Sequence, residues 1–156
     1  MTTADFIFGW EEWVGLPVLG LPSLKAKVDT GARTSALHAQ LIEPYDDNGT
    51  AMVRFTVQPV RRRPAIEIVC SAPVVDIRAV TSSNGETERR VVIVTDIEVG
   101  ARAWPIEITL TNRESMTYRM LIGRQALQPG MLVDPTASFR QARRSNKVYR
   151  KLLPPR

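Results

Sequence analysis

Apolar and polar residues alternate over short stretches along most of the chain, which is the pattern of half-buried β strands. Met52–Val57 shows this alternation most clearly, and Val91–Thr95 and Trp104–Leu110 are two further strand candidates. No long stretch places apolar residues at helical spacing. The pattern therefore predicts an all-β domain, folded as a sandwich or a barrel.

Turn residues separate these segments at regular intervals. Two Asn-Gly pairs, Asn48-Gly49 and Asn84-Gly85, lie between strand candidates, and Asn-Gly supplies the positive φ angles of a tight hairpin. Gly100 marks a third turn. The segments that the two Asn-Gly pairs join are Leu37–Ile42 with Met52–Val57, and Val74–Val80 with Arg90–Thr95.

The two ends of the domain supply further elements. Trp13–Pro17 and Lys25–Val28 are predicted as early strands, and the second leads directly to Asp29. After the apolar run 120–122, the segment Gly123–Gln128 is the best candidate for one short C-terminal helix, which Pro129 would end. A last strand is predicted at Met131–Val133.

A length of 156 residues fits one domain that buries its own core. The net charge of +5 is unevenly distributed. Residues 1–134 hold 14 Lys/Arg and all 16 Asp/Glu, whereas residues 135–156 hold seven basic residues and no acidic one. We therefore predict one folded domain at 1–134 and a basic C-terminal tail at 135–156, whose composition supports disorder and partner-induced folding equally. Contact with nucleic acid is expected only through this tail.

The chain contains no apolar run long enough to cross a bilayer, and its first residues lack the features of a secretion signal. A cytoplasmic location without membrane association is the expectation. The single cysteine, Cys70, lies in an apolar run and is expected to be a buried thiol rather than a nucleophile.

The strongest chemical signal is Asp29-Thr30-Gly31, which directly follows a predicted strand. By itself this tripeptide is compatible with an ordinary turn. Together with Leu121-Ile122-Gly123-Arg124 at the start of the predicted helix, it resembles the paired signatures of retroviral-type aspartic peptidases. This resemblance implies that residues 1–134 form a retropepsin-like peptidase domain, folded as an acid protease barrel.

A closer resemblance covers nearly all of residues 10–135. The chain is similar to a bacterial family labelled putative ATP-dependent zinc proteases, which is often encoded beside a ribosomal-protein glutamate ligase. The stretches that carry this resemblance are 9–14, 25–38, 80–85, 115–116 and 120–124. The sequence has no phosphate-binding Gly-rich loop with Lys-Ser/Thr and no His-Glu-x-x-His pair, so we expect neither ATP nor zinc as a cofactor, and no metal ligands are assigned.

The resemblance to aspartic peptidases assigns roles to individual residues. Asp29 would be catalytic, Gly31 would bring its N–H close to the carboxylate, and the Thr30 hydroxyl would hold two such loops together. Gly123 and Arg124 would support the loop from behind. An aspartic mechanism needs two carboxylates that share a proton, and no second Asp-Thr-Gly or Asp-Ser-Gly occurs, so a homodimer is implied.

The residues after Asp29 are candidates for substrate binding. They are Ala32, Arg33, Thr34, Ser35 and the only histidine, His38. A basic rim would suit an acidic peptide, and the family's association with glutamate addition points to a glutamate-extended ribosomal protein as substrate. Arg78, Arg89 and Arg90 are further candidates for binding its carboxylates. The hairpin at 82–85 is a candidate flap over the cleft.

Three functions are compatible with these residues. The first is an aspartic-type endopeptidase in which a pair of Asp29 carboxylates activates water. The second is a metal-assisted hydrolase in which Asp29 and His38 join other carboxylates around a divalent ion. The third is a non-catalytic accessory domain that binds the ligase, its acidic product or the ribosome.

Overall fold

The structure is a computed structural model that describes residues 6–82 and 84–152. Strands make up most of this part of the chain, and the helical segments are short 3-10 turns. The all-β prediction is therefore confirmed. The strands are β1 (Phe6–Gly9), β2 (Glu11–Leu16), β3 (Leu21–Asp29), β4 (Ser35–His38), β5 (Gln40–Asp47), β6 (Thr50–Val57), β7 (Ile68–Thr81), β8 (Thr87–Val99), β9 (Arg102–Thr111), β10 (Met120–Gly123) and β11 (Met131–Asp134). The 3-10 segments are η1 (Pro17–Leu19), η2 (Arg124–Ala126) and η3 (Asn146–Leu152).

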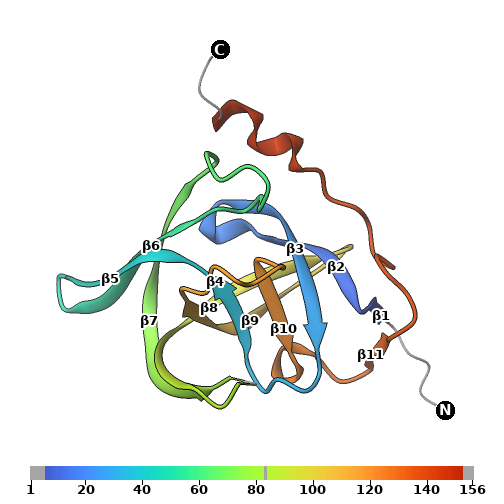
Figure 1. Ribbon diagram of the computed structural model, residues 1–156, viewed down its shortest axis with the longest axis horizontal. Helices are drawn as coiled ribbons and strands as arrows, with labels where there is room; N and C mark the ends of the chain where they lie inside the picture. Colours follow the sequence, from blue (N-terminus) through green and yellow to red (C-terminus); the bar gives the residue numbers. More distant parts are fainter. Residues whose placement is uncertain (1–5, 83, 153–156) are drawn as a thin grey trace.

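Most strands belong to one sheet that curls into a barrel (Figure 1). The strand order is β2-β3-β10-β4-β9-β8-β7-β6-β5, and an additional contact between β2 and β8 closes the barrel at Gly15 and Glu98. The hairpin of β5 and β6 extends beyond the barrel (Figure 1). β1 and β11 form a separate parallel pair that brings the two ends of the domain together.

The predicted turns lie where the sequence places them. Asp47 pairs with Thr50, so Asn48 and Gly49 alone connect β5 to β6, with φ angles of 50° and 90°. Gly100 has a φ of 58° and follows the last residue of β8. The second predicted hairpin joins β7 to β8. These turns are local, which is why their residues could be recognised in the sequence.

The core fills the barrel and extends toward β1. Leu24, Ala26 and Val28 of β3 are buried, while Lys25 and Lys27 between them are exposed, as expected for a strand with one face against the core. Phe8 and Trp104 pack edge to face, and the Trp104 indole N–H donates to the Ala126 carbonyl at 2.8 Å. This bond fixes η2 against the barrel.

Two predicted elements differ in the structure. The segment 37–42 was expected to be one strand, but it is divided between β4 and β5, because the Ala39 N–H bonds to the Thr111 carbonyl and Leu41 adopts a φ of 51°. The predicted helix at 123–128 is the single 3-10 turn η2, closed by a hydrogen bond from the Leu127 N–H to the Arg124 carbonyl.

Residues 135–150, which composition marked as a basic tail, pack along the barrel. The buried Glu12 carboxylate accepts hydrogen bonds from the backbone N–H groups of Gly9, Arg140 and Gln141. Arg144 forms an ion pair with Glu98 at 3.0 Å. The composition of the tail gave no sign of these contacts, because they depend on partners that lie 46 to 129 residues away in the sequence.

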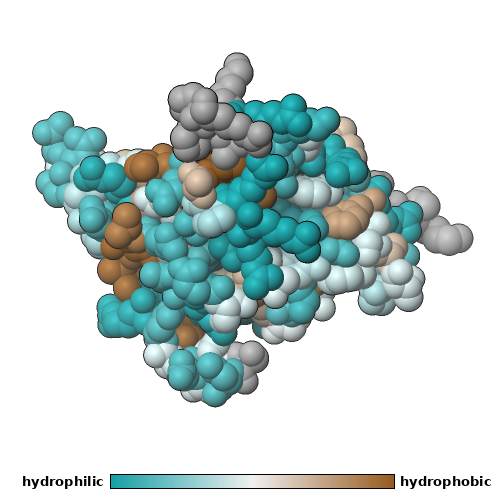
Figure 2. Space-filling view, turned by 45° about the horizontal axis from the view of Figure 1, so that its top comes forward, coloured by the Kyte–Doolittle hydropathy of each residue, from teal (hydrophilic) through white to brown (hydrophobic). Residues whose placement is uncertain are grey.

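Most of the face shown in Figure 2 is hydrophilic, with hydrophobic side chains exposed in small areas. In the described residues, no helix is long and apolar enough to span a membrane. The Cys70 thiol is buried as predicted, donates to the Leu19 carbonyl at 3.3 Å, and has its pKa raised to about 12 by burial.

Tyr149 provides a test of whether the C-terminal segment contributes to the stability of the barrel. Its hydroxyl accepts from the Ser23 N–H at 3.0 Å and donates to the Ser23 carbonyl. Tyr149→Phe leaves both buried backbone groups without this partner, and we expect the free energy of unfolding to fall by about 1–3 kcal/mol. Urea unfolding measures the change. Val148→Ala, at a neighbouring exposed position, is the control, and equal small effects of both variants would contradict the assignment.

Candidate functional site

Asp29 is the last residue of β3 and lies next to the end of β10. The two strands run parallel, and their register places Gly123 beside Asp29. β10 also pairs with β4, so it lies between the strand that enters the Asp29 loop and the strand that leaves it. The two sequence signatures, more than ninety residues apart, therefore meet at one point of the barrel.

The Asp29 loop is organised by short-range hydrogen bonds. The Gly31 N–H donates to Asp29 Oδ1 at 3.1 Å, and the Ala32 N–H donates to the Asp29 carbonyl at 3.1 Å. A Cβ on Gly31 would lie 3.3 Å from Asp29 Oδ1, which is a tight contact. Asp29 remains partly exposed, so the carboxylate is oriented by the backbone and accessible to water.

Gly123 and Arg124 support this loop from behind, as the sequence resemblance implied. A Cβ on Gly123 would lie 2.5 Å from the carbonyl carbon and oxygen of Thr34, so only glycine fits there. The Gly123 N–H donates to Ser35 Oγ at 3.1 Å. Arg124 donates twice, from its backbone N–H to the Ala32 carbonyl at 2.9 Å and from its guanidinium to the Gly31 carbonyl at 3.2 Å.

Asp29 opens into a large cleft of about 1010 Å³, here called the main cleft. One wall is the loop 31–34, and another is the end of β7, residues 78–81, with Ser82 directly after it. The predicted flap hairpin at 82–85 follows directly from this second wall. Residue 83 lies outside the described residues. Residues 80–82 line the main cleft, which is the position expected of a flap. That the hairpin moves over the cleft stays a prediction.

Positive charge dominates the main cleft. Its lining includes five arginines and two carboxylates, Asp29 and Glu107. Arg78 pairs with Asp76 and Glu107, and this exposed trio is mutually compensated. Among the described residues, the ion pairs include none with Arg33, Arg113 or Arg124. The cleft is therefore suited to an anionic ligand.

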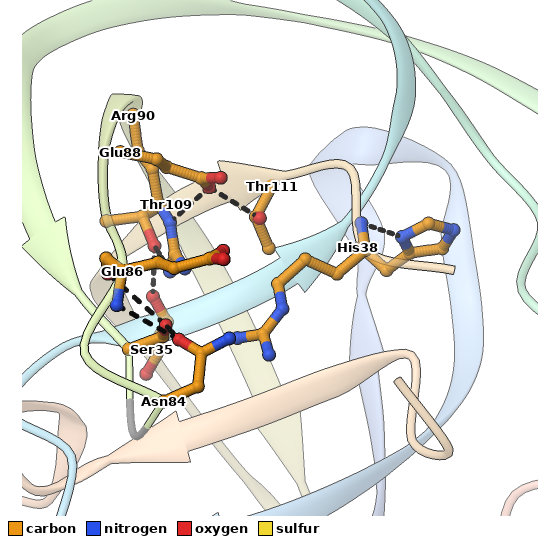
Figure 3. A network of polar contacts seen from close by, with 10 residues as sticks. Ser35, His38, Asn84, Glu86, Glu88, Arg90, Thr109 and Thr111 are labelled. Atoms are coloured by element: carbon orange, nitrogen blue, oxygen red, sulfur yellow. Dashed lines mark hydrogen bonds and ion pairs between the residues drawn. The ribbon is translucent and has the colours of Figure 1, made fainter. Parts of the chain in front are cut away.

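Arg90 belongs to a network of polar contacts with Glu88 and Thr109 (Figure 3). Its Nε donates to the Glu88 carboxylate at 2.6 Å, and the Thr111 hydroxyl donates to the same carboxylate oxygen at 2.6 Å. An Arg90 Nη also lies 3.4 Å from the Thr109 hydroxyl, which donates to the Ser35 carbonyl. This network connects β8 to the residue that supports Gly123. Arg89, the third arginine named from the sequence, is exposed and does not line the main cleft.

Three of the residues predicted to be catalytic or to bind substrate do not line the main cleft. Thr30 is exposed at the loop tip, Ser35 is buried and supports Gly123, and His38 is only 1% exposed. His38 Nδ1 accepts the Arg113 backbone N–H at 3.0 Å, and burial, aided by the charge of Arg119, lowers the pKa of the imidazole. His38 therefore holds the segment after β9, whereas a direct substrate contact was expected.

Arg113 is a cleft residue that sequence reasoning missed. It follows β9 and precedes the stretch 115–116 that carries part of the family resemblance, but Arg113 itself belongs to no motif, and only the fold brings it to the main cleft. The sequence gives no signal that would identify Arg113 as a cleft residue, because its place in the main cleft depends on the pairing of β9 with β4.

The side chains present do not form the zinc site that the label of the similar bacterial family suggests. Within residues 6–82 and 84–152, no group of three or more His, Cys, Asp or Glu side chains is arranged to hold a metal ion. Cys70 is buried in the core, and His38 is absent from the lining of the main cleft. No chemical step is assigned to a metal here.

Comparisons with known proteins agree with this geometry. The model of a family described as "RimB-like: Retropepsin-like aspartic endopeptidase RimB" matches residues 7–144. A protein from Shewanella pealeana named probable alpha-L-glutamate ligase is 49% identical over 139 residues, and one of the same name from Parasynechococcus marenigrum is 46% identical over 136 residues. These matches cover 89% and 87% of the chain but only 30% and 29% of the relatives, so the chain spans less than a third of their length.

A solved structure shares the fold. The crystal structure of a protein of unknown function from Legionella pneumophila superposes with a TM-score of 0.72 at 30% sequence identity, covering 87% of this chain and 98% of that one. The all-β barrel with a braced Asp-Thr-Gly loop defines the class as retropepsin-like. Within this class, the chain belongs to the RimB-like family. The sequence-based recognition of the fold and of the link to glutamate ligases is confirmed.

Gly123→Ala tests the support of the Asp29 loop. The added Cβ meets the Thr34 backbone, which cannot move without disturbing the loop, so we expect the free energy of unfolding to fall by about 1–3 kcal/mol. Urea unfolding measures the loss. Gln125→Ala, two residues away and exposed, is the control. A Gly123→Ala protein as stable as the control would show that the close approach is not required.

The buried His38 predicts a pH dependence of stability. Its pKa is lowered in the folded protein, so the unfolded chain takes up a proton first as the pH falls below about 6.5. His38 therefore stabilises the fold above this pH and loses this contribution as the pH falls toward the folded-state pKa, by at most about 1.4 kcal/mol per pH unit.

Urea unfolding of wild type and His38→Gln at pH 7.5, 6.5 and 5.5 measures this contribution. The difference in free energy of unfolding between the two proteins should become smaller as the pH falls. A difference that is independent of pH would show that His38 does not titrate differently in the folded and unfolded states.

Proposed function

We propose that this domain is an aspartic-type endopeptidase in which two copies of Asp29, one from each chain of a homodimer, activate water. The observation that carries the proposal is the Asp29 carboxylate itself. It is oriented by the Gly31 N–H and opens into the main cleft. Membership of a family described as retropepsin-like aspartic endopeptidases supports the same reading.

The need for a second chain follows from the chemistry. Hydrolysis requires one ionised carboxylate to take a proton from water and one protonated carboxyl group to polarise the scissile carbonyl. Glu107 is the other carboxylate of the main cleft, and it is already bound to Arg78 in an ion pair. A second Asp29 related by a two-fold axis supplies the missing group, with the exposed Thr30 of each chain at the contact.

The substrate that we propose is an acidic peptide, such as a glutamate-extended ribosomal protein. Two features support this choice. The arginines of the main cleft exceed its carboxylates, and Arg33 has no ion-pair partner among the described residues. The similar proteins from Shewanella are named probable alpha-L-glutamate ligases, and a hydrolase for glutamate-containing chains would act on the product of such a ligase.

An accessory role is the second candidate. Because the matched region is 30% of the Shewanella pealeana relative, a domain of this kind accompanies a much longer chain there. In that setting the arginine-rich cleft would bind an acidic chain for a neighbouring catalytic domain. The two functions are separated by removing the charge of Asp29: a peptidase would lose its cleavage activity, whereas an accessory domain would have no such activity to lose.

Asp29→Asn tests the peptidase proposal. Hydrolysis of a glutamate-extended peptide should fall at least about 100-fold, because an amide can neither accept nor share the proton. Mass spectrometry of the products measures cleavage, and the solution mass should be that of a dimer. Asp96→Asn, a matched change at an exposed position of β8, is the control and should retain activity. The wild-type protein should also retain activity in the presence of a chelator, because no metal is assigned to the mechanism. Binding without any Asp29-dependent cleavage would favour the accessory role.

A further inference from the structure

A second, smaller cavity of about 200 Å³ lies beside the main cleft, and we call it the side pocket. It lies between the flap hairpin and the segment that follows β9. The two cavities share four lining residues, which are Val80, Ser82, Arg90 and Arg113. A side chain of a peptide in the main cleft can therefore reach toward the side pocket between these residues.

The two arginines at this junction are held in place by different means. Arg90 is only 7% exposed, and its guanidinium is fixed by Glu88 and Thr109. Thr111 in turn fixes the Glu88 carboxylate from β9, as Figure 3 shows. The charge of Arg90 is thus compensated within the protein, and its position is set before any ligand binds.

Arg113 has an anchored backbone, and its side chain forms no ion pair among the described residues. Its N–H donates to Nδ1 of the buried His38, so the start of its side chain is anchored to β4. In the part of the chain that the structure describes, no carboxylate forms an ion pair with its guanidinium. The charge of Arg113 helps to lower the pKa of the nearby Glu88 carboxylate, but that carboxylate is ion-paired with Arg90. A half-buried guanidinium that lines two cavities without an ion pair of its own can therefore bind the carboxylate of a ligand.

The carboxylates of the side pocket do not occupy the junction. Glu86 and Glu88 line the side pocket but are absent from the lining of the main cleft, whereas Arg90 and Arg113 line both. A carboxylate that enters from the main cleft therefore approaches the arginines, and Glu88 is already neutralised by Arg90.

We propose that Arg113, with Arg90 beside it, binds a side-chain carboxylate of the peptide substrate at the junction of the main cleft and the side pocket. Arg113 is then a specificity-determining residue. This inference rests on the proposed function and deepens it, because it names the contact that distinguishes an acidic side chain from its amide. The guanidinium fork can bind both oxygens of a carboxylate, whereas an amide offers one oxygen and no charge.

The test measures peptide binding to the Asp29→Asn variant of the 156-residue chain, which retains the arginines and is not expected to cleave the probe. The probes are a peptide of consecutive glutamates and matched peptides in which one glutamate at a time is replaced by glutamine, and calorimetry gives each Kd. Arg113→Gln should weaken binding of the all-glutamate peptide about tenfold or more. One glutamate of the peptide is expected to contact Arg113. The peptide in which that glutamate is replaced by glutamine should bind with the same Kd to the Asp29→Asn protein with Arg113 and to the one with Arg113→Gln.

Arg89→Gln is the matched control, because Arg89 adjoins Arg90 in the chain but does not line either cavity. It should change the affinity less than twofold, roughly the effect of one screened surface charge. Equal weakening by Arg89→Gln and Arg113→Gln would overturn the inference in favour of general electrostatic attraction. The inference would also be overturned if Arg113→Gln changed the Kd of every peptide by the same factor, or if it changed the Kd of none of them.

Cleavage by proteins with the native Asp29 separates this inference from the proposed function. If the proposed function holds, Arg113→Gln should raise KM for the acidic peptide and leave kcat nearly unchanged. If no protein cleaves the peptides but the binding measurements give the expected result, the peptidase proposal fails and the carboxylate contact stands. If cleavage depends on Asp29 but not on Arg113, the reverse holds.

Discussion

The parallel pairing of β10 with β3 is the constraint on which the site depends. It sets Gly123 beside Asp29, and the absence of a side chain on Gly123 lets the Thr34 backbone approach within the space that a Cβ would fill. Once the two segments are this close, the hydrogen bonds from Arg124 to the loop carbonyls become possible. The orientation of the Asp29 carboxylate is therefore a consequence of sheet register as much as of the Asp-Thr-Gly tripeptide.

A second set of contacts builds the arginine-rich side of the cleft. Buried polar groups require partners, and here they find them across strands: Glu88 and Thr109 hold Arg90, and His38 holds the backbone of Arg113. Ser35 joins the two halves, since its carbonyl accepts from Thr109 and its hydroxyl accepts from the Gly123 N–H. Residues that seemed to be candidates for substrate contact thus serve to position those that line the cleft.

Much of the strand and turn pattern could be predicted, because alternation and turn chemistry are local. Asn48-Gly49 fixes its hairpin through two positive φ angles, and Lys25 and Lys27 point away from the core because they alternate with buried neighbours. The division of 37–42 into two strands was missed, since it depends on a hydrogen bond from Ala39 to the distant Thr111. The packing of residues 135–150 was missed for the same reason, because the partners that hold it, such as Glu12 and Ser23, lie on other strands.

The sequence by itself determined the fold class, the family and the Asp29 loop with Gly123 behind it, because short motifs or local periodicity indicate each of these. Only the tertiary structure decided which polar residues face the cleft. His38 follows the Asp29 loop closely in the chain and is buried, while Arg113 is far away in the chain and lines the cleft. The physical reason is that strand pairing sets which face each side chain occupies, and that pairing joins residues whose separation in sequence carries no signal.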